Sequence, residues 1–262
     1  MSKIMQGAGQ VGALFRMMKV RHWPRLLFYL IGRASVLAFG WFPCEHIILP
    51  FKALNVCAHT RRPSGLKFLV EIASQHAYAH VTVPATTTPL VLYDVGANCG
   101  FFSILLCKQH AHLKAYCFEP HPETFATLVK NIAINELQTR LIPLNCAAGA
   151  EPGELPINIS AGSSMAQMGS AAQGSDLTQV HLVSVVTLDA MAQQYEAPAV
   201  VKIDVEGHEV AVLLGARRIL PQVVSIVLEY HSPELKRKCH EALIDSGFSV
   251  QECGDLLYGV RV

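Results

Sequence analysis

The stretch from Leu90 to Gly100 constrains the fold more than any other part of the chain. An apolar run starts at Leu90 and ends at Asp94, as a strand buried in a parallel sheet does. Gly96 then allows a tight turn at the carboxyl end of the strand, and Gly100 allows the backbone to approach a ligand closely. The N–H groups of a helix that begins next can hold a negatively charged group. The stretch therefore predicts a strand, a ligand-binding turn and a helix, which together form the opening unit of an α/β sheet.

Short apolar runs and helical segments alternate from this point to the C-terminus. We expect strands over residues 90–95, 114–118, 141–146, 200–203, 223–229, 248–252 and 256–262, with helices over 101–109, 122–135, 208–220 and 233–245. Strand–helix alternation that closes with a pair of strands predicts a doubly wound α/β sheet.

The alternation breaks between residues 154 and 186. Two further strands, 154–160 and 180–186, are expected to flank a loop at 161–175 that is rich in Gly, Ser, Ala and Met. The loop is long for a compact domain and has no helical or strand period, which marks it as mobile or functional. We predict that it lies over the pocket for the second ligand, the acceptor, and becomes ordered on binding, because its composition is flexible and methionine adapts to irregular apolar surfaces.

Two acidic motifs follow later strands of the predicted sheet. Glu119 lies nineteen residues beyond Gly100, at the spacing typical of an acid that binds both hydroxyls of a ribose. The second motif is Val201-Lys-Ile-Asp-Val-Glu-Gly-His-Glu209, after a strand that should lie beside the first one. Ligands of open α/β sheets bind at these carboxyl ends, so the motif belongs to the same predicted site. Lys202 and Asp204 share one face of the strand, however, and the pair could simply neutralise itself.

Charge and cysteine usage exclude several classes of protein. The net charge at pH 7 is only +1, so the basic face of a nucleic-acid binder is not expected. The eight cysteines form no C-x-x-C pair, which favours a reducing, cytoplasmic compartment over a disulfide framework. The twelve histidines show no tight metal-binding spacing.

Residues 1–88 are predicted to form a mostly helical segment ahead of an α/β domain at 89–262. The run from Leu26 to Phe42 is largely apolar and follows a basic stretch. A membrane span needs about 20 apolar residues, and this run is shorter and contains Arg33, so no span is expected. Two interpretations remain. The segment packs on the α/β domain, which we favour, or it makes peripheral contact with a membrane surface as a basic amphipathic segment.

Three motifs taken together resemble the FkbM family of methyltransferases. They are Asp94-Val-Gly-Ala-Asn-Cys-Gly100, Phe118-Glu-Pro120, and Lys202-Ile-Asp-Val-Glu-Gly-His-Glu209 followed by Val212-Leu-Leu-Gly-Ala216. Their order and spacing match over roughly residues 88 to 262, and residues 1–88 show no such match. Asn98 stands where many nucleotide-binding folds carry a middle glycine, which favours this family over a dehydrogenase.

The resemblance implies a Rossmann-like class I methyltransferase fold with seven strands, mostly parallel with an antiparallel closing strand, and S-adenosylmethionine as cofactor. It implies that residues 94–100 surround the methionine part of the cofactor, that Glu119 binds the ribose and that residues 145–147 lie near the adenine. The residues expected to bind the cofactor are Asp94, Gly96, Asn98, Gly100, Phe101, Glu119, Pro120, Asn145, Ala147 and Asp204.

Such enzymes typically methylate a hydroxyl of a sugar, a glycolipid or a secondary metabolite, so a small-molecule or carbohydrate acceptor is expected. The protein must then align the acceptor and remove a proton. Asp204, Glu206 and His208 are the predicted catalytic residues, and His231 is a further candidate base. A divalent metal held by Asp204, Glu206 and Glu229 is not favoured. The alternatives are methylation of protein or nucleic acid, and a non-catalytic or NAD-binding Rossmann-like protein.

Overall fold

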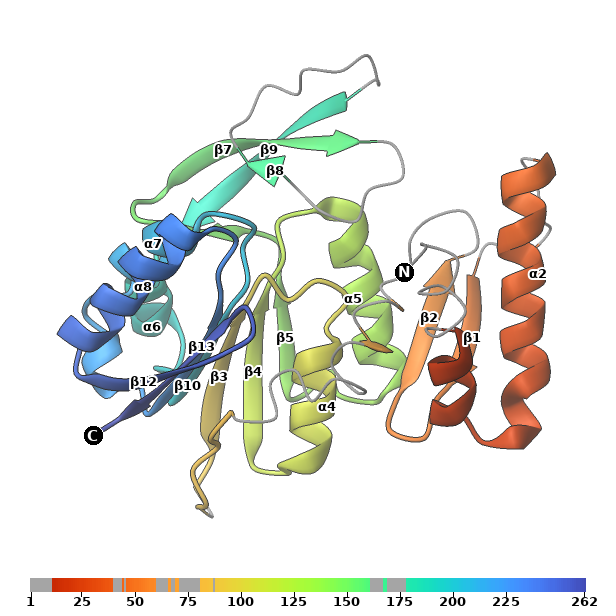
Figure 1. Ribbon diagram of the computed structural model, residues 1–262, viewed down its shortest axis with the longest axis horizontal. Helices are drawn as coiled ribbons and strands as arrows, with labels where there is room; N and C mark the ends of the chain where they lie inside the picture. The colour runs from red at the N-terminus through yellow and green to blue at the C-terminus, as the bar shows by residue number, and fades with distance from the viewer. Residues whose placement is uncertain are drawn as a thin grey trace.

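The computed structural model contains a seven-stranded sheet with helices on both faces, a smaller four-stranded sheet and an N-terminal segment (Figure 1). It describes residues 11–39, 44, 46–59, 66, 69–70, 81–86, 88–160, 167–168 and 178–262. Every strand of the large sheet comes from residues 90–261, which is the part of the chain where the sequence predicts strand–helix alternation.

The order of strands in the large sheet is β12-β13-β11-β10-β3-β4-β5. Their bounds are β3 Leu90–Val95, β4 Leu113–Phe118, β5 Leu141–Leu144, β10 Val200–Ile203, β11 Ser225–Glu229, β12 Phe248–Cys253 and β13 Leu256–Arg261. Strand β3 pairs in parallel with β4 and β10, whereas β13 is antiparallel to both β11 and β12. This confirms the predicted doubly wound sheet with an antiparallel closing strand. The strand order reverses at β3, and open α/β sheets bind their ligands at such a point.

Helices cover both faces of this sheet because side chains alternate along each buried strand. Leu92 of β3 belongs to an apolar cluster that includes residues of α4 (Phe101–Gln109) and α5 (Pro122–Ile134). Tyr93, the next residue, belongs to the opposite cluster, which includes residues of α6 (Leu188–Gln194), α7 (Glu209–Leu214) and α8 (Pro233–Asp245). The sheet is therefore buried on both faces, as its apolar strands predict.

One helical prediction needs correction, and one helix was not predicted. The helix expected over 208–220 ends at Leu214, and η2 (Leu220–Gln222) is a separate 3-10 turn. The C-terminal cap of the helix is Gly215, where the chain passes so close to residue 149 that a Cβ would lie 2.0 Å from the carbonyl oxygen of Gly149. The Asp189 carboxylate then accepts hydrogen bonds from the backbone N–H groups of Arg218 and Ile219. Asp189 belongs to α6, a short helix that the sequence pattern did not predict.

The smaller sheet rises above the carboxyl ends of β3 and β4 (Figure 1). It consists of β6 (Ala147–Ala148), β7 (Gly153–Ser160), β8 (Gln167–Met168) and β9 (Thr178–Val186), and β7 and β9 form a long antiparallel pair. Both long strands were predicted. Apart from β8, the loop predicted over 161–175 lies outside the described residues, so its role as a cover stays a prediction.

The N-terminal segment contains helical residues 11–17, η1 (Val20–His22) and α2 (Trp23–Phe39), and also β1 (His46–Pro50) and β2 (Asn55–His59), a two-stranded sheet that was not predicted. Strand β2 is fastened to α5 by two asparagines. The backbone N–H of Cys57 donates to Oδ1 of Asn131, and that of Asn55 donates to Oδ1 of Asn135. Among the described helices, none is long and apolar enough to cross a membrane.

Candidate active site

The turn after β3 brings the ends of three strands together. Its backbone has positive φ at Gly96, Asn98 and Gly100. The N–H groups of Gly96 and Ala97 both donate to the carbonyl oxygen of Phe118, at 3.0 and 2.9 Å, which fixes the turn against β4. On the other side, a Cβ at Gly96 would lie 1.8 Å from the carbonyl oxygen of Asp204, just beyond β10. The turn therefore needs glycine at position 96 both for its φ angle and for this contact.

Gly100 and Phe101 lie where the turn becomes α4. A Cβ at Gly100 would lie 2.4 Å from Cδ1 of Leu128, so this glycine allows α4 to pack closely on α5. The side chain of Phe101 is buried in the apolar cluster that also holds Leu128. A ligand at this edge would therefore contact Phe101 through its backbone N–H at the start of the helix.

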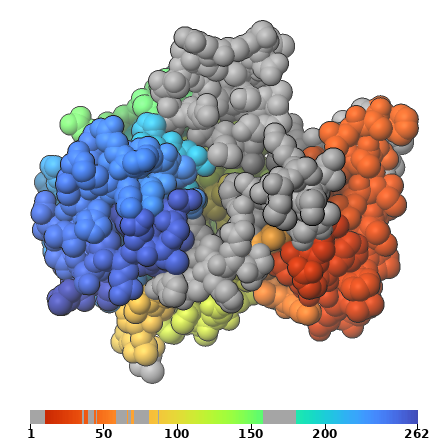
Figure 2. Space-filling view, in the orientation of Figure 1, coloured from red at the N-terminus to blue at the C-terminus, as the bar shows by residue number. Residues whose placement is uncertain are grey.

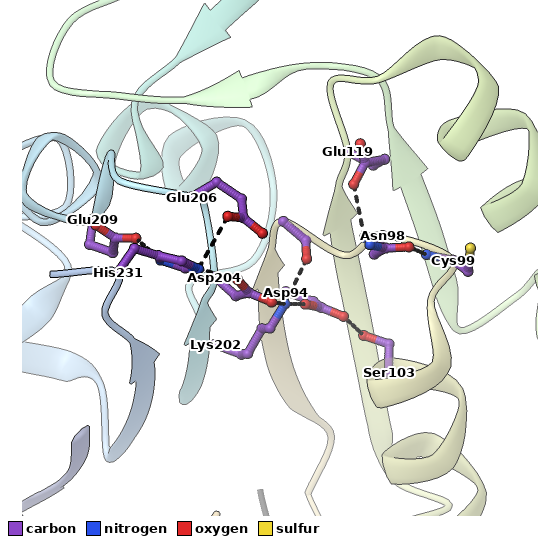
Figure 3. A network of polar contacts seen from close by, with 11 residues as sticks. Asp94, Asn98, Cys99, Ser103, Glu119, Lys202, Asp204, Glu206, Glu209 and His231 are labelled. Atoms are coloured by element: carbon purple, nitrogen blue, oxygen red, sulfur yellow. Dashed lines mark hydrogen bonds and ion pairs between the residues drawn. The ribbon is translucent and has the colours of Figure 1, made fainter. Parts of the chain in front are cut away.

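Glu119 connects the turns that follow β3 and β4 (Figure 3). Its Oε2 accepts a hydrogen bond of 2.8 Å from the N–H of Asn98, and its Oε1 accepts one of 2.9 Å from the N–H of His121. Burial raises the pKa of this carboxyl group to about 7. The two backbone N–H groups favour the charged form and lower the pKa, but the effect of burial is larger. A buried acid is thus held at the position where the sequence predicts recognition of a ribose.

The turn after β5 joins the same edge. The exposed side chain of Asn145 donates through Nδ2 to the carbonyl oxygens of Glu119, at 2.8 Å, and of Pro120, at 3.2 Å. Ala147 is buried at the start of β6. The structure therefore brings the predicted residues of the β3, β4 and β5 turns to one edge of the sheet.

A buried lysine links the turn after β3 to the end of β10. Nζ of Lys202 lies 3.3 Å from Oδ1 of Asp94 and 3.5 Å from Oδ2 of Asp204, and it donates to the carbonyl oxygen of Gly96 at 2.6 Å. Ser103 of α4 donates to the other oxygen of Asp94 at 2.6 Å. Burial lowers the pKa of Lys202, but the carboxylates of Asp94 and Asp204 more than offset this effect and the pKa lies above its ordinary value. Asp94 is fully buried, so its carboxylate orders the turn from within the protein.

His231, two residues beyond β11, lies among three carboxylates (Figure 3). Its Nδ1 lies 2.7 Å from Oε1 of the buried Glu209, while its Nε2 lies 3.4 Å from Glu206 and 3.8 Å from Asp204. The hydrogen bond with Glu209, together with the neighbouring charges of Glu206 and Asp204, raises the pKa of His231 to about 9, although partial desolvation of the imidazole acts in the opposite direction. His231 is therefore a cation at neutral pH and cannot accept a proton there, which argues against it as the resting base.

Glu206 and His208 occupy the loop between β10 and α7. Glu206 has φ of 51° and Gly207 has φ of 105°, so the chain turns sharply and directs the Glu206 carboxylate toward His231. Burial raises the pKa of Glu206 above its ordinary value. His208 forms the N-terminal boundary of α7, and burial lowers its pKa, so its imidazole is neutral at pH 7. Nδ1 of His208 is buried and has no hydrogen-bond partner among the residues that the structure describes.

The same cluster could hold a metal ion through one atom each from Asp204, Glu206 and His231. These ligand atoms all lie within 4.8 Å of one another. The sequence pointed to Glu229 as the third ligand, whereas the structure places His231 beside the two acids. Two carboxylates and an imidazole suit several divalent ions.

Sequence reasoning did not find that Lys202 also binds Asp94, or that Ser103 and Glu209 orient the charged groups. Ser103 lies within an apolar helix, where a lone hydroxyl gives no signal of its partner. The sequence named His231 as a candidate base but did not predict that it lies beside Asp204 and Glu206.

Comparison with known proteins places the chain in a family. The sequence profile described as "Methyltransferase FkbM domain" matches residues 94–256, which include all the site residues described above. The hexuronic acid methyltransferase AglP of Haloferax volcanii is 30% identical over 144 residues, 54% of this chain and 56% of that protein, so the match spans little more than half of it. The methyltransferase sdnD of Sordaria araneosa is 26% identical over 211 residues, 69% of this chain and 80% of that protein.

Among solved structures, fibrillarin of Aeropyrum pernix with bound S-adenosyl-L-methionine aligns with a TM-score of 0.44 and 12% identity. The alignment covers 72% of this chain and 74% of that one. The strand order of the large sheet, and not this alignment, identifies the fold.

Proposed function

The chain belongs to the FkbM methyltransferase family, and from this membership we propose that it transfers a methyl group from S-adenosylmethionine to a hydroxyl of a sugar, a glycolipid or a secondary metabolite. One observation carries the proposal. The buried Glu119 and the acids Asp204 and Glu206 lie on either side of the turn after β3, at the edge where such sheets bind ligands (Figure 3). The name of the Haloferax relative supports a carbohydrate acceptor. We assign this activity to residues 89–262.

The residues at this edge fit the chemical groups of the cofactor. The N–H groups at the start of α4 suit its carboxylate, and Glu119 suits the two ribose hydroxyls. Asn145 and Ala147 flank the region that we assign to the adenine. S-adenosylmethionine supplies a methyl group that its sulfonium already activates, so the protein needs to position the acceptor and remove one proton.

We propose that Asp204 takes this proton. The acceptor oxygen would bond to the methyl carbon as the carbon–sulfur bond breaks, sulfur would keep that electron pair, and the Asp204 carboxylate would take the hydroxyl proton. Asp204 is suited to this role because its side chain is partly exposed, at the end of β10, and lies between Lys202 and His231. Glu206 is the second candidate, since burial raises the pKa of its carboxyl group toward neutral pH, where a base works best. His208, which is neutral at pH 7, is the third.

Glu119→Ala is expected to weaken binding of S-adenosylmethionine by about 1–3 kcal/mol, the usual scale for losing hydrogen bonds to a charged group. In the unchanged protein, affinity should fall as the pH drops through about 7, because Glu119 then takes up a proton and becomes a weaker acceptor. Glu119→Gln should remove this pH dependence. Calorimetric titration across this pH range measures both effects.

Glu234→Gln is the matched control, because this glutamate is exposed on α8. Its variant should bind like the unchanged protein. Full affinity in Glu119→Ala would contradict the ribose assignment. If calorimetric titration detected binding of NAD but no binding of S-adenosylmethionine or its demethylated product, the assignment of the cofactor would be wrong.

The acceptor class can be tested with methyl-labelled cofactor and separate pools of free sugars and uronic acids, glycolipids, RNA and protein. We expect label in a carbohydrate-containing pool, and mass spectrometry of the product should place it on oxygen. Label confined to RNA or protein would contradict the proposed acceptor and leave the cofactor assignment standing. Cofactor binding without transfer to any pool would support a non-catalytic binding protein instead.

A further inference from the structure

The outward side of α2 is apolar along its length. Trp23, Leu27, Ile31 and Ala34 are all exposed and lie on one side of the helix, because they are spaced four, four and three residues apart. The exposed fraction is 50% for Leu27 and 58% for Ile31, and it reaches 79% for Leu37 and 83% for Phe39 near the end of the helix. A surface helix of a globular protein normally carries polar residues on this side. Something apolar is therefore expected to cover it.

The opposite side of α2 is already used for packing on the protein. Leu26 and Tyr29 are buried in the apolar cluster that also contains Leu49 of β1. The helix lies at the outer edge of the molecule, at the right in Figures 1 and 2, and its outer side faces away from the large sheet. The exposed apolar surface is thus additional to the one that docks α2.

The charged residues of α2 and of the segment that precedes it are all basic. Exposed cations lie at and before the start of α2, namely Arg16, Lys19, Arg21 and Arg25. The first 44 residues hold 6 of the 21 lysines and arginines and none of the 20 aspartates and glutamates. The rest of the chain therefore has more acids than bases. This asymmetry attracts the N-terminal segment, and not the α/β domain, to a negatively charged surface.

We infer that α2 docks the protein on the surface of a bilayer that contains anionic lipids. The helix has 17 residues, which gives a length of roughly 25 Å, and it would lie in the plane of the interface with Leu27 and Ile31 turned toward the acyl chains. The cations at its start would contact lipid phosphates. Each cation would strengthen the electrostatic attraction to the membrane, and added salt would weaken this attraction by screening. This site is independent of the proposed methyl transfer, since it lies on an element outside the large sheet.

Flotation of the full chain with lipid vesicles tests the inference. Binding is expected to vesicles made of equal parts phosphatidylcholine and phosphatidylglycerol. It should be much weaker with pure phosphatidylcholine, and should decrease as salt is added. Ile31→Glu is expected to reduce partitioning by about tenfold or more, because it places a charge in the apolar face. Replacing Lys19, Arg21 and Arg25 together by glutamine should remove the preference for anionic lipid.

Leu182→Glu is the matched control. Leu182 is 68% exposed on β9, so the same substitution there changes charge without touching α2, and binding should be unchanged. Thermal unfolding of each variant shows whether it is folded. No flotation with either vesicle, or equal loss in Ile31→Glu and Leu182→Glu, would overturn the inference. So would a dimer in solution that Ile31→Glu dissociates, because a second copy of the chain would then cover α2.

Discussion

Asp204→Asn should lower the turnover number by about 10²–10⁴-fold on the true acceptor, the range expected for loss of a general base. The substitution keeps the shape of the side chain and removes its charge. Affinity for S-adenosylmethionine should change little, because Glu119 and the turn after β3 remain in place. Steady-state assays with labelled cofactor measure turnover, and calorimetry measures cofactor affinity. Asp245→Asn, at an exposed aspartate that ends α8, is the control and should leave both unchanged.

The alternatives to Asp204 as the base give different results in the same assays. Near-normal turnover in Asp204→Asn would mean that alignment alone drives the reaction or that His208 accepts the proton. Glu206→Gln should have the next largest effect, since Glu206 lies 3.4 Å from the same His231. Activity that a chelator abolishes and magnesium or manganese restores would instead identify Asp204, Glu206 and His231 as metal ligands.

Lys202→Met is expected to lower the free energy of unfolding by about 3–5 kcal/mol, the cost of leaving one partner of a buried ion pair without the other. The partner here is Asp94, which is fully buried 3.3 Å from Nζ of Lys202. The carbonyl oxygen of Gly96 also loses its donor. Urea denaturation followed by circular dichroism measures the change.

The double variant Lys202→Met with Asp94→Asn should recover part of this loss, because no uncompensated charge then remains in the interior. Lys238→Met removes an exposed lysine that pairs with Glu234 on α8, and it should have little effect. Unchanged stability in Lys202→Met would contradict the role of Lys202 in joining the β3 and β10 ends. A double variant less stable than the single one would show that the Asp94 carboxylate is stabilising without the lysine.

Local sequence determined the elements that carry the site. The bounds predicted for β3, β10, α4 and α8 agree with the structure, because apolar runs, glycines and prolines act on their immediate neighbours. Local sequence was a poorer guide for the helix predicted over 208–220, which was too long at its C-terminal end. That helix ends where Gly215 packs closely against Gly149, and nothing near residue 215 in the sequence indicates the position of residue 149.

The sequence by itself determined that acids at positions 119, 204 and 206 follow strands of an α/β sheet, and their motifs indicated the family before any coordinates. Only the tertiary structure decided what each acid contacts. Lys202 bridges Asp94 and Asp204 because β10 pairs with β3, and His231 meets Asp204 because β11 pairs with β10. Such contacts depend on strand order, which is fixed by the packing of the whole sheet. The apolar outer side of α2 is a further case, since the pattern shows an apolar helix and only packing shows which of its sides remains exposed.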